Sequence, residues 1–237
     1  MSIKLYKSND RGKANLDWLQ ANHSFSFGHY FNPDCMNFGL LRVLNDDTIA
    51  PSKGFDTHPH NDMEIVTIPL EGALTHKDDM GHESVICHGD VQVMSAGTGV
   101  LHSEFNASDM DPVKLLQIWV DPNKKGLTPR YDQKTFEPAG RHNTCQLLVS
   151  PDGRNGSLSI HQSAFFSLVE LSSKSSTDYS MYNEKNGIYL FLISGAISVL
   201  NHNLGKRDAV SIQKTPFITL KNGPYASLAL ILEVPLK

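Results

Sequence analysis

Short apolar runs separated by turn residues dominate the hydrophobic pattern of this chain. Clear examples lie at 115–120, 217–220 and 228–232. Each run is about as long as a strand, and Asp, Asn, Gly and Pro gather between the runs. Helical periodicity, with apolar residues three and four positions apart, is rare. The pattern therefore predicts an all-β protein built as a sandwich or barrel.

Two local predictions follow from the same pattern. Residues 189–193 and 196–200 are apolar runs joined through Gly195, which predicts a β-hairpin with glycine at its turn. The segment 14–19 spaces its alanine, leucines and tryptophan in a way that predicts one short helix.

A polar segment rich in proline and glycine lies at 122–141 and contains few apolar residues. Such a composition is typical of a connection between two folded units. We therefore predict two domains, an N-terminal barrel at 1–135 and a C-terminal barrel at 136–237.

The two halves also resemble each other weakly. Residues 70–74 are similar to 193–197, residues 89–93 are similar to 207–211, and the spacing within each half is similar. An internal repeat of this kind favours duplication of one barrel. Chance similarity between short β segments is the alternative.

Composition narrows the classes of protein. The chain has 237 residues, of which 40% are hydrophobic, and its formal net charge is −4. This balance argues against disorder and against a basic nucleic-acid-binding surface. We find no apolar run long enough for a membrane helix and no apolar signal segment. Three irregularly spaced cysteines fit a reducing compartment, so we expect a cytoplasmic protein.

Two pairs of residues carry the candidate chemistry. His58 and His60 are two positions apart, and His102 and Glu104 repeat that spacing. On a strand, residues two apart point to the same face. If the two strands face each other inside a barrel, three imidazoles and one carboxylate converge on one divalent metal ion.

The alternatives for these residues are specific. One HxH pair alone also fits two ordinary histidines. Glu64 is a second candidate carboxylate, but along a straight strand it lies about 13 Å beyond His60, so we favour Glu104. The remaining histidines lack such neighbours. We expect solvated or hydrogen-bonded side chains for His142, His161 and His202, and exposed ones for His76, His82 and His88.

An aromatic cluster lies near the N-terminus and contains Phe25, Phe27, Tyr30 and Phe31. Two roles are open for it: packing in the core or at the barrel mouth, and a stacking wall for an aromatic substrate.

Glycines around the two pairs resemble the cupin signature. The first block comprises Gly54, the HxH pair, Glu64 and Gly72, and the second comprises Gly89, Gly97, Gly99, His102 and Asn106. Two departures concern the turns rather than the ligands. Gly54 is two residues nearer to His58 than usual, and Gly97 stands where the signature has proline.

A narrower resemblance, to the pirin family, covers most of the chain. It rests on segments in the same order along the sequence, which are 42–47, 54–60, 62–64, 70–72, 76–78, 94–99, 102–104, 117–120, 129–131 and 152–158. Pirins are bicupins, so the resemblance implies two tandem cupin β-barrels. It further implies one metal ion, usually Fe(II), held in the N-terminal barrel by His58, His60, His102 and Glu104. Other transition metals stay open, and we expect a metal-free C-terminal barrel.

The resemblance implies a dioxygenase that uses dioxygen to cleave a flavonol such as quercetin at its 2,3 bond. Glu104 is then the candidate general base for the flavonol hydroxyl. Residues that bind the substrate stay unidentified. The alternatives are a regulatory or redox-sensing protein that acts through a protein partner, in the nucleus if the source is eukaryotic, and a catalytically idle barrel.

Overall fold

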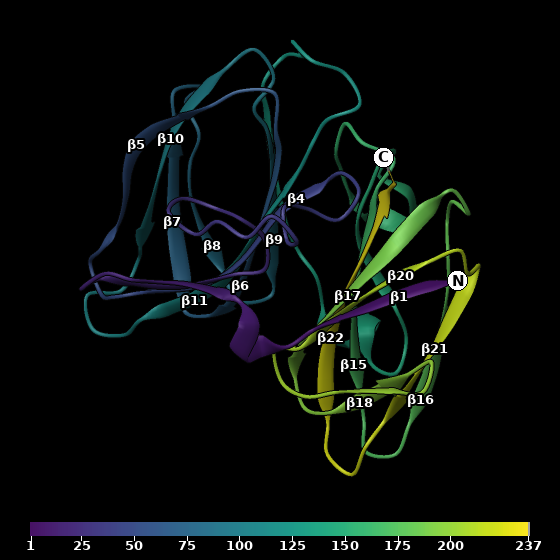
Figure 1. Ribbon diagram of the computed structural model, residues 1–237. Helices are drawn as coiled ribbons and strands as arrows, with labels where there is room; N and C mark the ends of the chain where they lie inside the picture. The colour runs from purple at the N-terminus through teal and green to yellow at the C-terminus, as the bar shows by residue number, and fades with distance from the viewer. Residues whose placement is uncertain (237) are drawn as a thin grey trace.

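A computed structural model describes residues 1–236, which form 22 strands and three short 3₁₀ segments. The 3₁₀ segments are η1 (Ser8–Asp10), η2 (Pro138–Arg141) and η3 (Arg154–Gly156). No helix in this part of the chain has the length and apolarity to span a membrane. The strands form two bodies side by side (Figure 1). The prediction of an all-β fold is confirmed.

The N-terminal body combines a seven-stranded and a four-stranded antiparallel sheet. In spatial order the larger sheet contains β12 (Arg130–Thr135), β9 (Asp90–Ser95), β6 (Glu64–Glu71), β11 (Val113–Val120), β4 (Leu41–Ile49), β3 (Leu19–His23) and β2 (Gly12–Asn15). The smaller sheet contains β5 (Gly54–His60), β10 (Val100–Asn106), β7 (Ala73–Asp78) and β8 (Glu83–Cys87). Alternate residues of β10 are buried, as expected for a strand with one face toward a barrel interior.

The C-terminal body repeats this arrangement. Its larger sheet contains β1 (Ser2–Tyr6), β20 (Ala209–Gln213), β17 (Asn186–Ser194), β22 (Ser227–Pro235), β15 (Phe165–Leu171), β13 (Gln146–Ser150) and β14 (Leu158–Ser159). Its smaller sheet contains β16 (Ser176–Ser180), β21 (Phe217–Asn222), β18 (Ile197–Val199) and β19 (His202–Leu204).

Register establishes which residues correspond in the two bodies. The Asn106 side chain donates a hydrogen bond to the carbonyl of Ile49 at the end of β4, at 3.1 Å. The Asn222 side chain does the same to Leu171 at the end of β15, at 3.0 Å. Strands β10 and β21 are therefore equivalent, residue for residue, and the duplication suggested by the sequence extends to the topology.

The N-terminal strand of the chain lies in the C-terminal body. Strand β1 pairs with β20 in the C-terminal sheet, and Figure 1 shows it in purple among the green and yellow strands. Strand β12, which lies inside the predicted connection 122–141, pairs with β9 and closes the N-terminal sheet. Strand β1 is thus an edge strand of the C-terminal larger sheet, and β12 is an edge strand of the N-terminal larger sheet. The boundary at residues 135 and 136 remains our proposal, with β1 as a segment that crosses over it.

The largest hydrophobic cluster joins the two larger sheets. It includes Leu44 and Val66 from the N-terminal body and Phe191 and Leu230 from the C-terminal body. A second cluster fills the interior of the C-terminal barrel. The apolar clusters of the N-terminal barrel are smaller, because its interior also holds polar side chains.

Two local predictions are wrong. Residues 14–19 form no helix, because they include the end of β2 and the start of β3, which pair with each other, and β3 also pairs with β4. The predicted hairpin fails because β17 and β18 belong to different sheets. Gly195 adopts a φ of 86° and redirects the chain from one sheet to the other, as Gly72 does with a φ of 75° between β6 and β7.

The shared cluster predicts that the two bodies unfold together. Phe191 is fully buried in it, so Phe191→Ala should lower the free energy of unfolding by about 3–5 kcal/mol. Calorimetry should show one transition that moves to lower temperature. Phe217→Ala, at a position that is 55% exposed, is the control and should change stability by less than about 0.5 kcal/mol. Two separate transitions, with only one shifted, would contradict a shared core.

Candidate metal centre and adjoining pocket

The two predicted pairs lie on neighbouring strands of the smaller N-terminal sheet. Strands β5 and β10 are antiparallel, with His58 opposite His102 and His60 opposite Val100. A register shift lies between His102 and Glu104, so Glu104 pairs with Phe55. The period of two directs all four side chains to the barrel interior.

Three of the predicted ligands converge. His58, His60 and His102 each offer a ring nitrogen within 4.8 Å of the others. The Nε2 atoms of His58 and His102 are 3.0 Å apart. Three imidazole nitrogens are ligands that suit a transition metal. They leave coordination positions open for other ligands.

The tautomer of His58 suits this role. Its Nδ1 lies 2.7 Å from the carbonyl oxygen of Asp56, which can only accept a hydrogen bond. The proton is therefore on Nδ1, and Nε2 keeps a free lone pair directed to the cluster.

Burial keeps the imidazoles of His60 and His102 neutral. It lowers the pKa of His60 to about 4, with the His58 ring contributing further. It lowers the pKa of His102 to about 2, with the neighbouring His58 and His60 rings as further causes. Neutral imidazole is the form that binds a metal.

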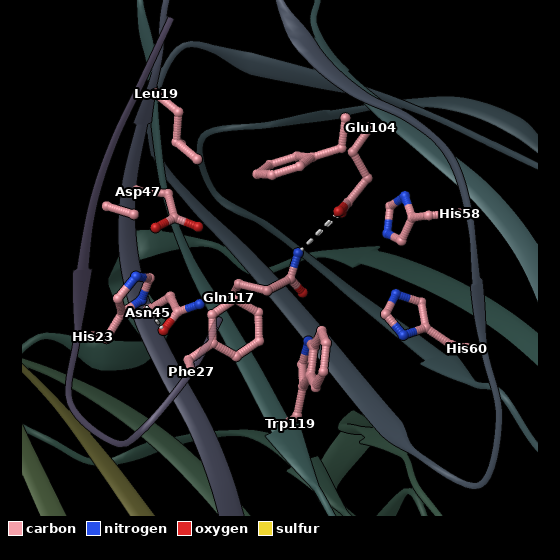
Figure 2. A pocket seen from close by; sticks show the side chains of 12 residues that line it. Leu19, His23, Phe27, Asn45, Asp47, His58, His60, Glu104, Gln117 and Trp119 are labelled. Carbon is pink, nitrogen blue, oxygen red and sulfur yellow. Dashed lines mark hydrogen bonds between the residues drawn. The ribbon is translucent and has the colours of Figure 1, made fainter. Parts of the chain in front are cut away.

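Glu104 lies beside this cluster and is turned toward Gln117. The Gln117 amide donates to both carboxylate oxygens at 3.1 Å, and Figure 2 shows the two side chains facing each other. Its carboxylate forms a second close group with His102 and His76. Burial raises the pKa of Glu104 to about 7, against the lowering effect of the hydrogen bonds from Gln117.

Glu64, the alternative carboxylate, is engaged elsewhere. It is 1% exposed and accepts hydrogen bonds from the Ser95 hydroxyl at 2.7 Å and the His161 backbone N–H at 3.1 Å. It therefore connects the N-terminal sheet to the C-terminal half. His161 itself is half-buried.

The prediction for His76 is wrong. We expected an exposed side chain, but it is fully buried and packs behind His102, with the two Nδ1 atoms 3.4 Å apart. Its Nε2 is 3.2 Å from Asp78. The alternation of Leu74, His76 and Asp78 along β7 is the sequence signal for this inward face. His82 is half-buried, and His88 is exposed as expected.

The C-terminal barrel has no imidazole or carboxylate at the equivalent positions. The counterparts of His58, His60, His102 and Glu104 are Tyr179, Met181, Ile218 and Leu220. These four residues belong to, or pack against, the apolar cluster of that barrel.

A pocket of about 180 Å³ adjoins the metal centre (Figure 2). Its lining comprises Leu19, Ala21, His23, Phe27, Asn45, Asp47, Phe55, His58, His60, Glu104, Gln117 and Trp119. Of the aromatic cluster noted in the sequence, Phe27 lines this pocket, whereas Phe25 packs in the shared core. Asp47, Gln117 and Trp119 lie in segments that carry the family resemblance, but nothing local marks them as pocket residues, because β4 and β11 bring them there from distant parts of the chain.

Comparison with known proteins identifies the family of this chain. A family model described as Pirin matches residues 5–120, and one described as Quercetinase C-terminal cupin domain matches residues 147–234. Quercetin 2,3-dioxygenase of Escherichia coli K12 is 49% identical over 160 residues, which are 68% of each chain. The chain belongs to the pirin family. The resemblance stated from its motifs is confirmed.

Further relatives extend the match along the chain. The putative quercetin 2,3-dioxygenase ZMO1337 of Zymomonas mobilis is 42% identical over 212 residues, 89% of each chain. The crystal structure of YhhW from Escherichia coli has a TM-score of 0.94 at 37% identity and covers 100% of this pirin and 99% of that chain. YhhW in complex with nickel(II) has a TM-score of 0.93 at 36% identity, with full coverage of both chains. The prediction of two tandem cupin barrels is confirmed.

The raised pKa of Glu104 predicts proton release when metal binds. At pH 6 its carboxyl is mostly protonated, whereas His60 and His102 are already neutral, so a cation that recruits the carboxylate displaces one proton. Affinity for Ni²⁺ should rise about fivefold from pH 6 to pH 7 and level off above about pH 8. Calorimetry in buffers of different ionisation enthalpy measures the protons released. Glu104→Gln should release one proton fewer at pH 6, and equal release by both proteins would contradict the assignment.

Proposed function

We propose that this pirin is a metal-dependent dioxygenase that cleaves a flavonol such as quercetin at its 2,3 bond. His58, His60, His102 and Glu104 would hold one Fe(II) ion in the N-terminal barrel. The observation that carries the proposal is the position of three convergent imidazoles at one end of an aromatic-lined pocket. The names of the relatives, quercetin 2,3-dioxygenase and its putative forms, support the same chemistry.

The metal, when bound, supplies a Lewis acid that lowers the pKa of a coordinated hydroxyl group. Glu104 takes the proton from the 3-hydroxyl of the flavonol. This carboxyl, whose pKa is about 7 without metal, would be ionised beside the cation and could therefore accept the proton at neutral pH. Gln117 donates to both carboxylate oxygens and so orients Glu104.

The walls of the pocket bind and shield the flat substrate. Trp119 contacts His60 with ring centroids 4.8 Å apart and contacts Phe27 at 5.3 Å. These rings form a continuous surface on which an aromatic ligand can stack. Leu19 and Phe55 add apolar contacts that exclude water from the reacting group.

The role of Glu104 predicts a difference between two buried glutamates. Glu104→Gln should lower the rate of quercetin cleavage at least about 100-fold, since it removes the general base. Glu64→Gln should keep most activity, because an amide oxygen can still accept the bonds from Ser95 and His161. Quercetin loss and carbon monoxide release after addition of oxygen give the measurement. Similar losses in both variants would contradict the role of Glu104.

The asymmetry of the two barrels predicts one metal ion per chain. The C-terminal counterparts of the four proposed ligands are Tyr179, Met181, Ile218 and Leu220, which lack imidazole and carboxylate donors. Elemental analysis after reconstitution with Fe(II) should give one equivalent, and His58→Ala should reduce it to near zero. Two tightly bound equivalents would disprove the prediction.

A further inference from the structure

The end of the pocket away from the histidine cluster contains a carboxyl group without a partner. Asp47, on β4, is 4% exposed, and its Oδ1 atom is buried with no hydrogen-bond partner. Figure 2 shows the carboxyl directed into the pocket. Its polar neighbours do not satisfy it, because the His23 ring and the Asn45 side chain bond to each other at 2.8 Å.

The nearby cation Arg11 attracts the Asp47 carboxyl through space but forms no ion pair with it. Arg11 and Arg207 both form ion pairs with Asp46, at 3.1 and 2.9 Å, and Asp46 is the preceding residue on the strand. Within residues 1–236 no ion pair reaches Asp47. A buried carboxyl without partners lowers the stability of the folded protein. Its presence therefore has to be explained by something other than stability.

The barrel architecture does not require a carboxyl at this position. Ile49 pairs with Val113 at the start of β11, and its counterpart Leu171 pairs with Ser227 at the start of β22. Two residues earlier on the same strands, Asp47 therefore corresponds to Val169. That valine is fully buried in the apolar cluster of the C-terminal barrel.

A wall of rings connects Asp47's end of the pocket to the metal centre. His60 contacts Trp119, Trp119 contacts Phe27, and Phe27 contacts His23 with ring centroids 5.3 Å apart. Roughly 150 Å³ is enough for a benzene ring, so the pocket of about 180 Å³ accommodates one ring of a larger flat ligand. A flat ligand bound to the metal by one edge therefore presents its opposite edge to Asp47.

We propose that Asp47 is a specificity-determining residue that binds a hydroxyl group on the edge of the ligand farthest from the metal. The ligand class is a polyhydroxylated aromatic compound. A hydroxyl both donates and accepts, so it pairs with the carboxyl in either protonation state. This proposal rests on the proposed function, in which one edge of the ligand binds the metal. It adds a second polar contact, between Asp47 and the opposite edge of the ligand.

Two flavonols separate these contacts. Quercetin and 3-hydroxyflavone share the 3-hydroxyl and 4-carbonyl groups, but 3-hydroxyflavone lacks every other hydroxyl. Anaerobic titration of the Ni²⁺-loaded protein, followed by quenching of tryptophan fluorescence, gives both affinities without turnover. The wild-type protein should bind quercetin about tenfold more tightly, as expected for one buried hydrogen bond.

Substitution of Asp47 tests the assignment. Asp47→Val should remove the preference for quercetin and leave 3-hydroxyflavone affinity unchanged, whereas Asp47→Asn should retain part of the preference. The Ni²⁺-loaded Asp47→Val protein should also unfold at a higher temperature than wild type, because valine fills the equivalent site in the other barrel. Thr48→Val, one residue along β4 and half-buried on the opposite face, is the matched control and should keep the preference.

The outcomes separate the two proposals. An unchanged preference in Asp47→Val would disprove binding of a hydroxyl by Asp47, and a lower unfolding temperature would assign its carboxyl a structural role. If the preference depends on Asp47 but the iron-loaded protein releases no carbon monoxide, the ligand contact stands and the dioxygenase proposal fails. Failure of wild type to bind either flavonol would overturn both.

Discussion

Packing between the two seven-stranded sheets is the contact on which the rest of the molecule depends. The cluster between them draws on both halves of the chain, and strands β1 and β12 close the larger sheets at their outer edges. Together with the apolar interior of the C-terminal barrel, it supplies most of the hydrophobic burial. The interior of the N-terminal barrel is thereby free to hold polar groups that a single small barrel could not easily accommodate.

One physical effect, the removal of water, shapes that polar interior in two directions. It lowers the pKa of His60 and His102 and raises the pKa of Glu104 and Asp47, the last to about 8 with the charges of Asp46 and Glu104 adding to the effect. All four groups thus favour their neutral forms. A divalent cation changes this balance, because it stabilises a carboxylate next to neutral imidazoles.

The metal centre could be predicted from sequence because its information is local. Two residues two apart on a strand share a face, so the HxH and HxE pairs indicate their own geometry. The pocket could not be predicted in this way. Asp47 and Trp119 reach it through the pairing of β4 and β11, which are more than 60 residues apart in the chain. His76 was misplaced because a polar segment suggested a turn, whereas β7 alternates between interior and surface. The false hairpin failed for a related reason, since a glycine with positive φ can redirect a strand to another sheet as readily as reverse it.

The duplicated barrel separates what the fold needs from what the site needs. Asn106 and Asn222 occupy the same position in both halves, and each bonds the carbonyl that ends the preceding strand, which is a requirement of the shared backbone. Around them the interior residues differ: Ile218 stands for His102, Leu220 for Glu104 and Ile231 for Gln117. Because the C-terminal barrel folds with apolar residues at these positions, the barrel fold does not require the polar groups. Because buried polar groups lower stability unless they are paired, their concentration in one barrel only is best explained by ligands that pair with them there.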